Sequence, residues 1–116
     1  MTATDPTQDN AVFLRGRLGA EPVARELPSG DEILTFRLTV DRPSDANATR
    51  SRVDSIDCAS AALKVRRCVE KARPGDCLEV HGALHRRFWR SAGALGSRYE
   101  VVVSSARVNR RRRSDA

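Results

Sequence analysis

The chain has 116 residues and a formal net charge of +6 at pH 7, and 40% of its residues are hydrophobic but only 4% are aromatic. This length fits a single domain whose modest core is packed mainly by aliphatic side chains. No apolar run is long enough to cross a membrane and the polar N-terminus has no signal-peptide core, so we expect a cytoplasmic protein with no membrane partner. The basic balance fits an anionic partner, most commonly nucleic acid, or serves solubility alone.

Composition divides the chain into a flexible lead over residues 1–9, one domain over residues 10–108 and a basic tail over residues 109–116. The tail contains the consecutive arginines Arg110, Arg111, Arg112 and Arg113. Neighbouring charges that repel one another gain most from a polyanion. The tail is therefore either an arm that orders on phosphate groups, which we favour, or a solvated end.

Apolar and polar residues alternate over residues 10–18 and again over residues 33–40, which predicts two strands that each bury one face. The Pro-Ser-Gly sequence at residues 28–30 is a turn signal between them. Residues 41–50 have no apolar periodicity and are expected to form an exposed loop. The predicted core face of the second strand consists of Leu34, Phe36, Leu38 and Val40.

The second half of the chain predicts a strand, a helix and a hairpin. Residues 52–60 alternate as a third strand, and over residues 61–72 the apolar period becomes that of a helix, which Pro74-Gly75 ends. The last two strands are expected to form a hairpin around a loop at residues 90–97. In the third strand the inward residues are Ile56 and Cys58, and the outward ones are Ser55, Asp57 and Ala59. The packing face of the helix consists of Ala62, Val65, Val69 and Ala72.

This order of elements is typical of one architecture. Three strands, a helix and two strands follow one another in an OB-fold, which is an all-β, five-stranded Greek-key barrel with one α-helix between strands 3 and 4. Periodicity alone supports a small β-barrel with one helix. The narrower OB assignment also depends on the family resemblance given below.

The stretch from Leu78 to Trp89 carries the strongest functional signal. If it is a strand, its side chains alternate between two faces. The core face then contains Leu78, Val80 and Leu84, and the opposite face contains Glu79, His81, His85, Arg87 and Trp89. An aromatic ring beside arginines on an outer sheet face suits single-stranded nucleic acid, because the ring stacks on a base and guanidinium groups bind phosphates. The alternative is a bulge near Phe88 that turns Trp89 into the core or against a partner subunit.

Five motifs occur in order along the chain. They are Asn10-Ala-Val-Phe-Leu-Arg-Gly-Arg-Leu-Gly19, Glu21-Pro-Val-Ala-Arg25 with Pro28-Ser-Gly30 and Phe36-Arg-Leu38, Arg73-Pro-Gly-Asp76, Val80-His-Gly-Ala-Leu84 through Trp89, and Arg98-Tyr-Glu-Val-Val-Val103. As an ordered set they resemble the first strand, the first hairpin, the turn before strand 4 and the last hairpin of the bacterial single-stranded DNA-binding protein family.

The resemblance implies binding of single-stranded DNA without a sequence code, with no cofactor and no metal, by a homo-oligomer (a dimer or a tetramer). The processes it implies are DNA replication, repair and recombination, and replication or repair proteins are further candidate partners. DNA-contacting positions of the family fall on Trp89, which would stack on a base, and on Arg87 and His85. The outward basic residues that strand alternation places beside them are Arg15, Arg17 and Arg37.

The chain also departs from the family pattern. Ser55 and Ala61 occupy positions where family members carry further stacking aromatics, and residues 41–52 contain no aromatic side chain. Each stacked ring contributes roughly 1–3 kcal/mol per base, so we expect weaker and more electrostatic binding, weakened further by Asp57 and Glu79 on the same face. The family's acidic C-terminal tail is replaced by arginines. These departures keep a second hypothesis open, a primosomal-type OB-fold adaptor that acts mainly through protein–protein contacts.

Other chemistry is not indicated. Cys77, His81 and His85 recur every fourth residue, but on a strand each lies about 13 Å from the next, too far for metal–ligand bonds of about 2 Å. Cys58, Cys68 and Cys77 are expected to be reduced, buried small side chains. No nucleophile–base motif or phosphate-binding glycine loop occurs, so we expect that the protein is not an enzyme.

Overall fold

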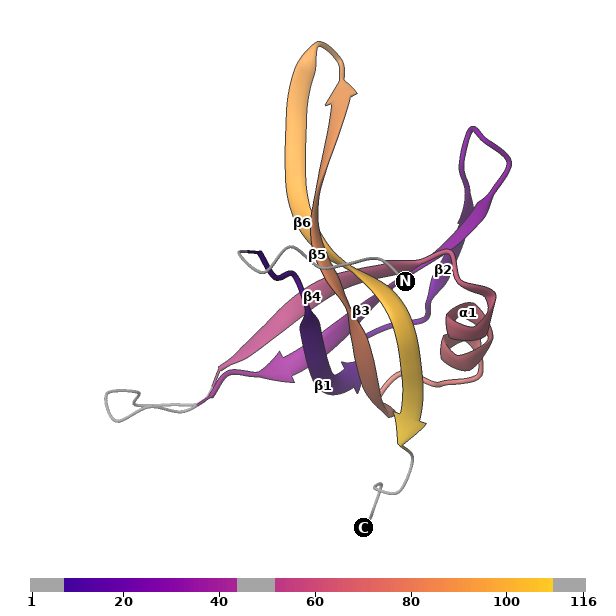
Figure 1. Ribbon diagram of the computed structural model, residues 1–116, viewed down its shortest axis with the longest axis vertical. Coiled ribbons are helices and arrows are strands. Elements are labelled where there is room, and N and C mark those ends of the chain that lie inside the picture. The colour runs from indigo at the N-terminus through magenta and orange to yellow at the C-terminus, as the bar shows by residue number, and fades with distance from the viewer. Residues whose placement is uncertain (1–7, 44–51, 110–116) are drawn as a thin grey trace.

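The structure is a computed structural model that describes residues 8–43 and 52–109, in which six strands and one helix form (Figure 1). The elements are β1 (Val12–Leu18), β2 (Val23–Glu26), β3 (Glu32–Asp41), β4 (Val53–Ser60), α1 (Leu63–Glu70), β5 (Cys77–Ser91) and β6 (Ala94–Asn109). Most of the loop predicted at residues 41–50 lies outside the described residues, and Asp41 itself ends β3.

Five of the strands close into a barrel. Their order is β1-β5-β6-β4-β3, and β3 pairs back with β1, while β2 extends the sheet only beyond β3. The β4–β6 pairing is parallel, through Cys58 and Val101, and the other pairings of the described strands are antiparallel. β1 reaches both neighbours because it approaches β3 closely at Gly16, where a Cβ atom would lie 2.6 Å from the Thr39 carbonyl oxygen. The predicted all-β OB-fold barrel is confirmed, with α1 between its third and fourth strands.

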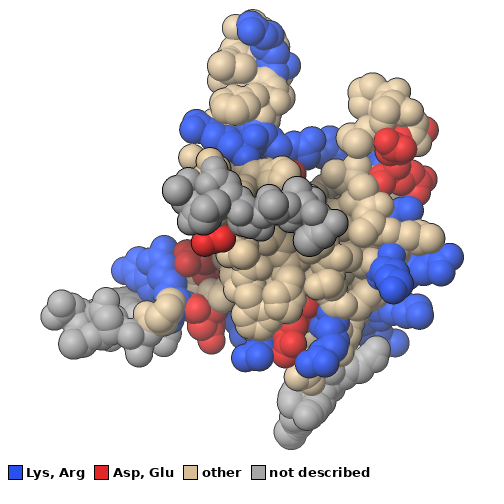
Figure 2. All heavy atoms as spheres, viewed as in Figure 1, with Lys and Arg blue, Asp and Glu red and all other residues tan. Residues whose placement is uncertain are grey.

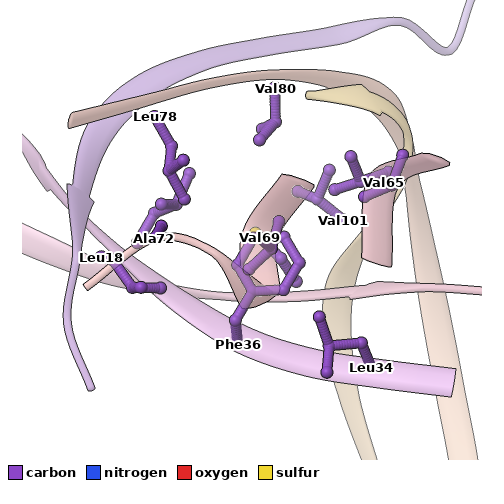
Figure 3. Packing of buried hydrophobic residues seen from close by; sticks show 12 residues of the cluster. Leu18, Leu34, Phe36, Val65, Val69, Ala72, Leu78, Val80 and Val101 are labelled. Atoms are coloured by element: carbon purple, nitrogen blue, oxygen red, sulfur yellow. The ribbon is translucent and has the colours of Figure 1, made fainter. Parts of the chain in front are cut away.

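Aliphatic side chains from the strands and one face of α1 fill the barrel (Figure 3). Leu34, Phe36 and Leu38 are buried as the alternation predicts, and Val40 packs partly buried against them. α1 packs along β6. Its predicted packing face is confirmed for Val65, Val69 and Ala72, and wrong for Ala62, which is the exposed N-cap of the helix.

The β5–β6 hairpin is much longer than the sequence predicts. Its pairing continues to Ser91 and Ala94, so the loop expected at residues 90–97 is wrong. Only two residues form the turn, Ala92 with φ 51° and Gly93 with φ 81°. Two successive positive φ values are the geometry of a tight turn that matches the twist of the strands it joins. The strands therefore continue past the barrel as a two-stranded ribbon.

The ribbon leaves the barrel at a defined point. β1 pairs with β5 only as far as Val12 and Gly82, and the Asn10 side chain then bonds to both backbone groups of Leu84, at 2.8 Å to the carbonyl oxygen and 2.7 Å from the N–H. On the other edge, β4 pairs with β6 no further than Val101. Leu84 was predicted in the core and is instead 45% exposed, because nothing in the described part of the chain covers it there.

Two smaller predictions also need correction. The ladder irregularity lies at His81 and Gly82, and pairing is regular from Gly82 to Ser91, so the predicted alternative of a bulge near Phe88 is wrong. Ala59 was placed on the outer face of the third strand, yet it is only 2% exposed. Ala59 pairs with Thr35 on β3 and with Val102 on β6, so both neighbouring side chains are larger than its methyl group.

Candidate nucleic-acid interface

Trp89 lies near the tip of the ribbon, on the side that the alternation predicts. It is paired with Gly96, and its ring covers that glycine so closely that a Cβ atom there would lie 2.6 Å from the indole. The Arg98 guanidinium lies 5.8 Å from the centroid of the ring. The Trp89 side chain is 44% exposed, so the alternative that it packs into the core is wrong. A fixed and half-exposed indole is a ready stacking surface for a base.

Two arginines oppose each other beside this ring. Arg87 and Arg98 are directly paired across the ribbon, an arrangement of like charges that is destabilising unless anions lie near. Arg87 Nη1 lies 3.3 Å from Oε2 of the buried Glu100, and Arg98 Nη1 lies 3.7 Å from Oδ2 of Asp57. Each carboxylate offsets one guanidinium. We call this side of the ribbon the front face, which consists of His85, Arg87, Trp89, Gly96, Arg98 and Glu100.

The front face continues onto the barrel through Asp57. Arg37 Nε on β3 donates to Asp57 Oδ1 at 2.9 Å, so Asp57 joins Arg37 to Arg98. A hollow of about 250 Å³ opens here between the β2–β3 and β5–β6 hairpins, and its lining includes Val23, Thr35, Arg37, Asp57, Arg98 and Glu100. Figure 2 shows Lys and Arg side chains extending from the base of the β5–β6 hairpin across to the β2–β3 hairpin. The structure thus brings Arg37 and Arg98 to one groove and places Arg87 and Trp89 next to Arg98 on the adjoining front face.

Arg15 does not lie in that groove. Its Nε donates to Glu79 Oε2 at 3.0 Å, and Arg107 donates to the other carboxylate oxygen at 3.3 Å. The hydrogen bond from Arg15 is the main reason that the pKa of Glu79 lies below its usual value. Glu79 precedes Trp89 by ten positions on β5, about 33 Å along a strand. Arg15 and Glu79 therefore lie away from the groove, farther along the sheet from Trp89.

The remaining candidate residues lie at the margins. Arg17 on β1 pairs with Thr39 and lies 3.7 Å from Asp41, so it is on the same outer barrel surface as Arg37. His85 is exposed on the front face, opposite Glu100. The tail arginines Arg110, Arg111, Arg112 and Arg113 lie outside the described residues.

Positions that carry rings in the resembled family contribute none here. Ser55 is exposed on β4, where it pairs with Thr39 beside the Arg37–Asp57 ion pair, and Ala61 is exposed directly after β4. Hydroxyl groups and ion pairs therefore form the β3–β4 part of this surface, and the exposed aromatic rings lie on the ribbon and at Phe13 on β1.

Arg98 is not among the residues that the sequence predicts to contact DNA. Its position became visible only with the pairing register, which places it against Arg87 and over Trp89. Alternation along residues 98–103 carried part of the signal, because it puts Arg98 and Glu100 on one face. No sequence pattern says which face of one strand meets which face of its partner.

Cys58 lies at the floor of the groove. Burial, with the nearby charges of Asp57 and Glu100, raises the pKa of its thiol to about 12, so the thiol stays neutral. Cys68 and Cys77 are only partly buried, which corrects the prediction that all of the cysteines are buried, and each is a free thiol. Within residues 8–43 and 52–109, no cluster of three or more His, Cys, Asp and Glu side chains has the arrangement of a metal site.

Within the described ranges, no helix has the length and apolarity that spanning a membrane requires.

Comparison with known proteins identifies a family and structurally similar solved proteins. The model of the single-strand binding protein family matches residues 9–109. A solved Plasmodium falciparum SSB in complex with ssDNA is 25% identical and has a TM-score of 0.76, with 94% of this chain and 99% of that chain covered. No functionally curated protein matches.

Proposed function

This chain belongs to the single-strand binding protein family, and from that premise we propose that it binds single-stranded DNA without sequence specificity. The similarity to the Plasmodium falciparum SSB, whose structure is a complex with ssDNA, supports this proposal. So does the composition of the front face, on which an exposed indole lies beside guanidinium groups.

The observation that carries the proposal is the placement of Trp89. Its ring rests on Gly96 and contacts Arg98, and almost half of the side chain is open to solvent. A base that stacks on the ring meets a surface that is already ordered, so little side-chain entropy is lost. Arg87, Arg98 and Arg37 lie where they can bind the adjacent phosphates.

The carboxylates of the groove predict how strong that binding is. Asp57 and Glu100 must share their arginines with incoming phosphates, so part of each ion pair is exchanged rather than newly formed. Together with the absence of rings at Ser55 and Ala61, this predicts an affinity lower than several stacking rings would give. Binding is then dominated by phosphate contacts and depends strongly on salt.

Titration of Trp89 fluorescence with oligothymidine tests the proposal directly, because this is the only tryptophan of the chain. We expect saturable quenching and an affinity that falls as salt rises. The logarithm of the binding constant should fall with the logarithm of the salt concentration, with a slope of about −0.7 per phosphate neutralised. If sedimentation shows binding but the fluorescence is not quenched, the stacking role of Trp89 is contradicted and binding depends on arginine–phosphate contacts alone. Absence of binding at low salt contradicts the function itself.

We further propose that the protein acts as a homo-oligomer in the cytoplasm, in DNA replication, repair or recombination. Sedimentation equilibrium of the free protein separates a monomer from a dimer or tetramer. The tail from Arg110 to Arg113 is proposed as an additional phosphate-binding arm, and its truncation is expected to lower the salt dependence of binding.

An adaptor that works through protein contacts is the second candidate. The ion pairs of Arg37, Arg87 and Arg98 with two carboxylates favour it, because guanidinium groups that are partly compensated are less attractive to a polyanion. In that case Trp89 is buried in the assembled complex. Acrylamide quenching of Trp89 in the free oligomer distinguishes the two: an accessible ring supports DNA binding, and a protected ring supports the adaptor.

A further inference from the structure

We propose that the opposite side of the β5–β6 ribbon is a second stacking surface, which binds a further segment of the same single-stranded DNA. This inference rests on the proposed function. Side chains at Arg86, Phe88 and Tyr99 point away from the front face, because the register pairs Arg86 with Tyr99 and Phe88 with Ser97. We call this side the back face; it consists of Leu84, Arg86, Phe88, Arg90, Leu95, Ser97 and Tyr99. The proposed stacking site within it is formed by Arg86, Phe88 and Tyr99, and Leu84 and Leu95 lie outside that site.

The back face exposes aromatic rings that no packing explains. Phe88 is 61% exposed and Tyr99 is 57% exposed. Both lie beyond the last pairings of β1 with β5 and of β4 with β6, so the ribbon there has two open faces and two open edges (Figure 1). Rings of this size are normally placed where they bury area. Their exposure indicates a ligand rather than a fold requirement.

One arginine organises the two rings. The Arg86 guanidinium carbon lies 5.2 Å from the centroid of Phe88 and 5.2 Å from that of Tyr99. Its Nη2 also donates to Ser97 Oγ at 3.0 Å. The guanidinium is thereby held between the rings as a planar cation, and each ring keeps a face for a base.

Charge indicates what this surface binds. Among the described residues, no carboxylate forms an ion pair with Arg86 or Arg90, and the back face contains no acidic side chain. On the front face, by contrast, Arg87 and Arg98 each have a carboxylate partner. An uncompensated cation between rings is complementary to a base followed by its phosphate. A purely apolar protein partner would instead leave both arginines to be desolvated without partners.

The position of the two surfaces allows one strand to use both. Phe88 and Trp89 are consecutive residues on opposite faces of a ribbon only two strands wide. A single DNA strand whose base stacks on Trp89 can pass over an open edge of the ribbon, and its next bases can stack on Phe88 and Tyr99. Short oligonucleotides should then occupy the groove alone, and longer ones should add the back face.

The test compares oligothymidines of about 4 and about 16 nucleotides, the limits of OB-fold site sizes. The variant Phe88→Leu/Tyr99→Leu removes both rings and keeps apolar side chains. We expect the unmodified protein and this variant to bind the short oligonucleotide equally, and the variant to bind the long one at least about fivefold more weakly. Ultraviolet crosslinking followed by mass spectrometry should attach thymine to the peptide that contains Tyr99 only with the long oligonucleotide.

A matched control removes apolar area from the same face without removing a ring. Leu84→Ala/Leu95→Ala should bind both oligonucleotides as the unmodified protein does. Equal loss in this control and in the ring variant overturns stacking and indicates apolar docking. A change of sedimentation mass in the ring variant without DNA overturns the site as well, since the back face is then an interface between copies. If the unmodified protein binds neither oligonucleotide, the proposed function fails too. If the unmodified protein and the ring variant bind the short and the long oligonucleotide with equal affinity, only the back-face site is overturned.

Discussion

The β5–β6 hairpin has a half within the barrel and a free half, the ribbon. The two halves share one pairing and one alternation of side chains, yet their side chains differ in burial. In the barrel half, Leu78 and Val80 are fully buried against the helix and the neighbouring strands. In the free half, Leu84 and Phe88 continue the same face of the same strand and are exposed. The comparison teaches that alternation decides which face a residue belongs to, whereas the neighbouring strands decide whether that face is a core or a binding surface.

The largest expected difference between the halves is in stability. Leu78→Ala should lower the free energy of unfolding by about 2–5 kcal/mol, because it leaves a cavity in the barrel. Leu84→Ala, the same change on the same face, should alter it by no more than about 0.5 kcal/mol. Urea denaturation followed by far-ultraviolet circular dichroism measures both. Similar losses in the two variants would show that the free half is covered in solution.

Removing the indole should affect binding and leave the barrel intact. Trp89→Ala is expected to weaken oligothymidine binding by about 1–3 kcal/mol through the loss of one stacked base. Fluorescence anisotropy of a labelled oligonucleotide measures this without the tryptophan signal. Leu63→Ala, an exposed apolar truncation on α1, serves as the control and should bind normally. An unchanged affinity in the Trp89 variant refutes the stacking role.

The buried thiol under the groove makes the barrel sensitive to alkali. The pKa of Cys58 rises from 9.0 to about 12 on folding, so the unfolded chain releases this proton first. The contribution is fully present below pH 9 and is lost as the pH rises toward 12; at pH 9.5 the loss is about 0.8 kcal/mol. Cys58→Ala should flatten the dependence of unfolding free energy on pH, whereas Leu34→Ala, at a buried side chain that does not titrate, should not. Equal slopes in the two variants would contradict this assignment.

The smallest effect concerns the charge balance where the two halves meet. Asp57→Asn releases Arg37 and Arg98 from their shared carboxylate, and we expect binding to strengthen by about 0.5 kcal/mol. The salt dependence should become steeper, because more counterions are released. Asp31→Asn changes the net charge equally, but among the described contacts the Asp31 carboxylate accepts a hydrogen bond only from Ser29 Oγ. If the two variants behave alike, net charge and not the ion pairs sets the affinity.

Much of the barrel could be predicted because its strands obey one simple rule. Leu34, Phe36 and Leu38 alternate with polar residues, and burial of one face follows from geometry alone. The same rule failed for Leu84, since the period of a strand does not tell where its neighbours end. It also gave too long a loop at residues 90–97, because an alanine at positive φ is an unusual turn residue and gives no recognisable signal.

The site was only partly predictable for a related reason. Alternation placed Trp89 beside Arg87 because both lie on one strand, and local geometry is enough for that. Arg15 has the same outward orientation, but which outward residues share a surface depends on the curvature of the barrel and the pairing of distant strands. Arg98 was missed for the same reason, since only the register between β5 and β6 brings it to the indole.

The pairing of β1 with β5 has a consequence for how the chain reaches its native state. Val12 pairs with Gly82, so the first strand cannot take its place until most of the chain exists. At about 5–20 residues per second, synthesis of the intervening segment takes roughly 4–14 s. Barrels built from such distant pairings fold in milliseconds to seconds. Synthesis is therefore slower than barrel closure, and the first strand waits for its partner with one apolar face uncovered.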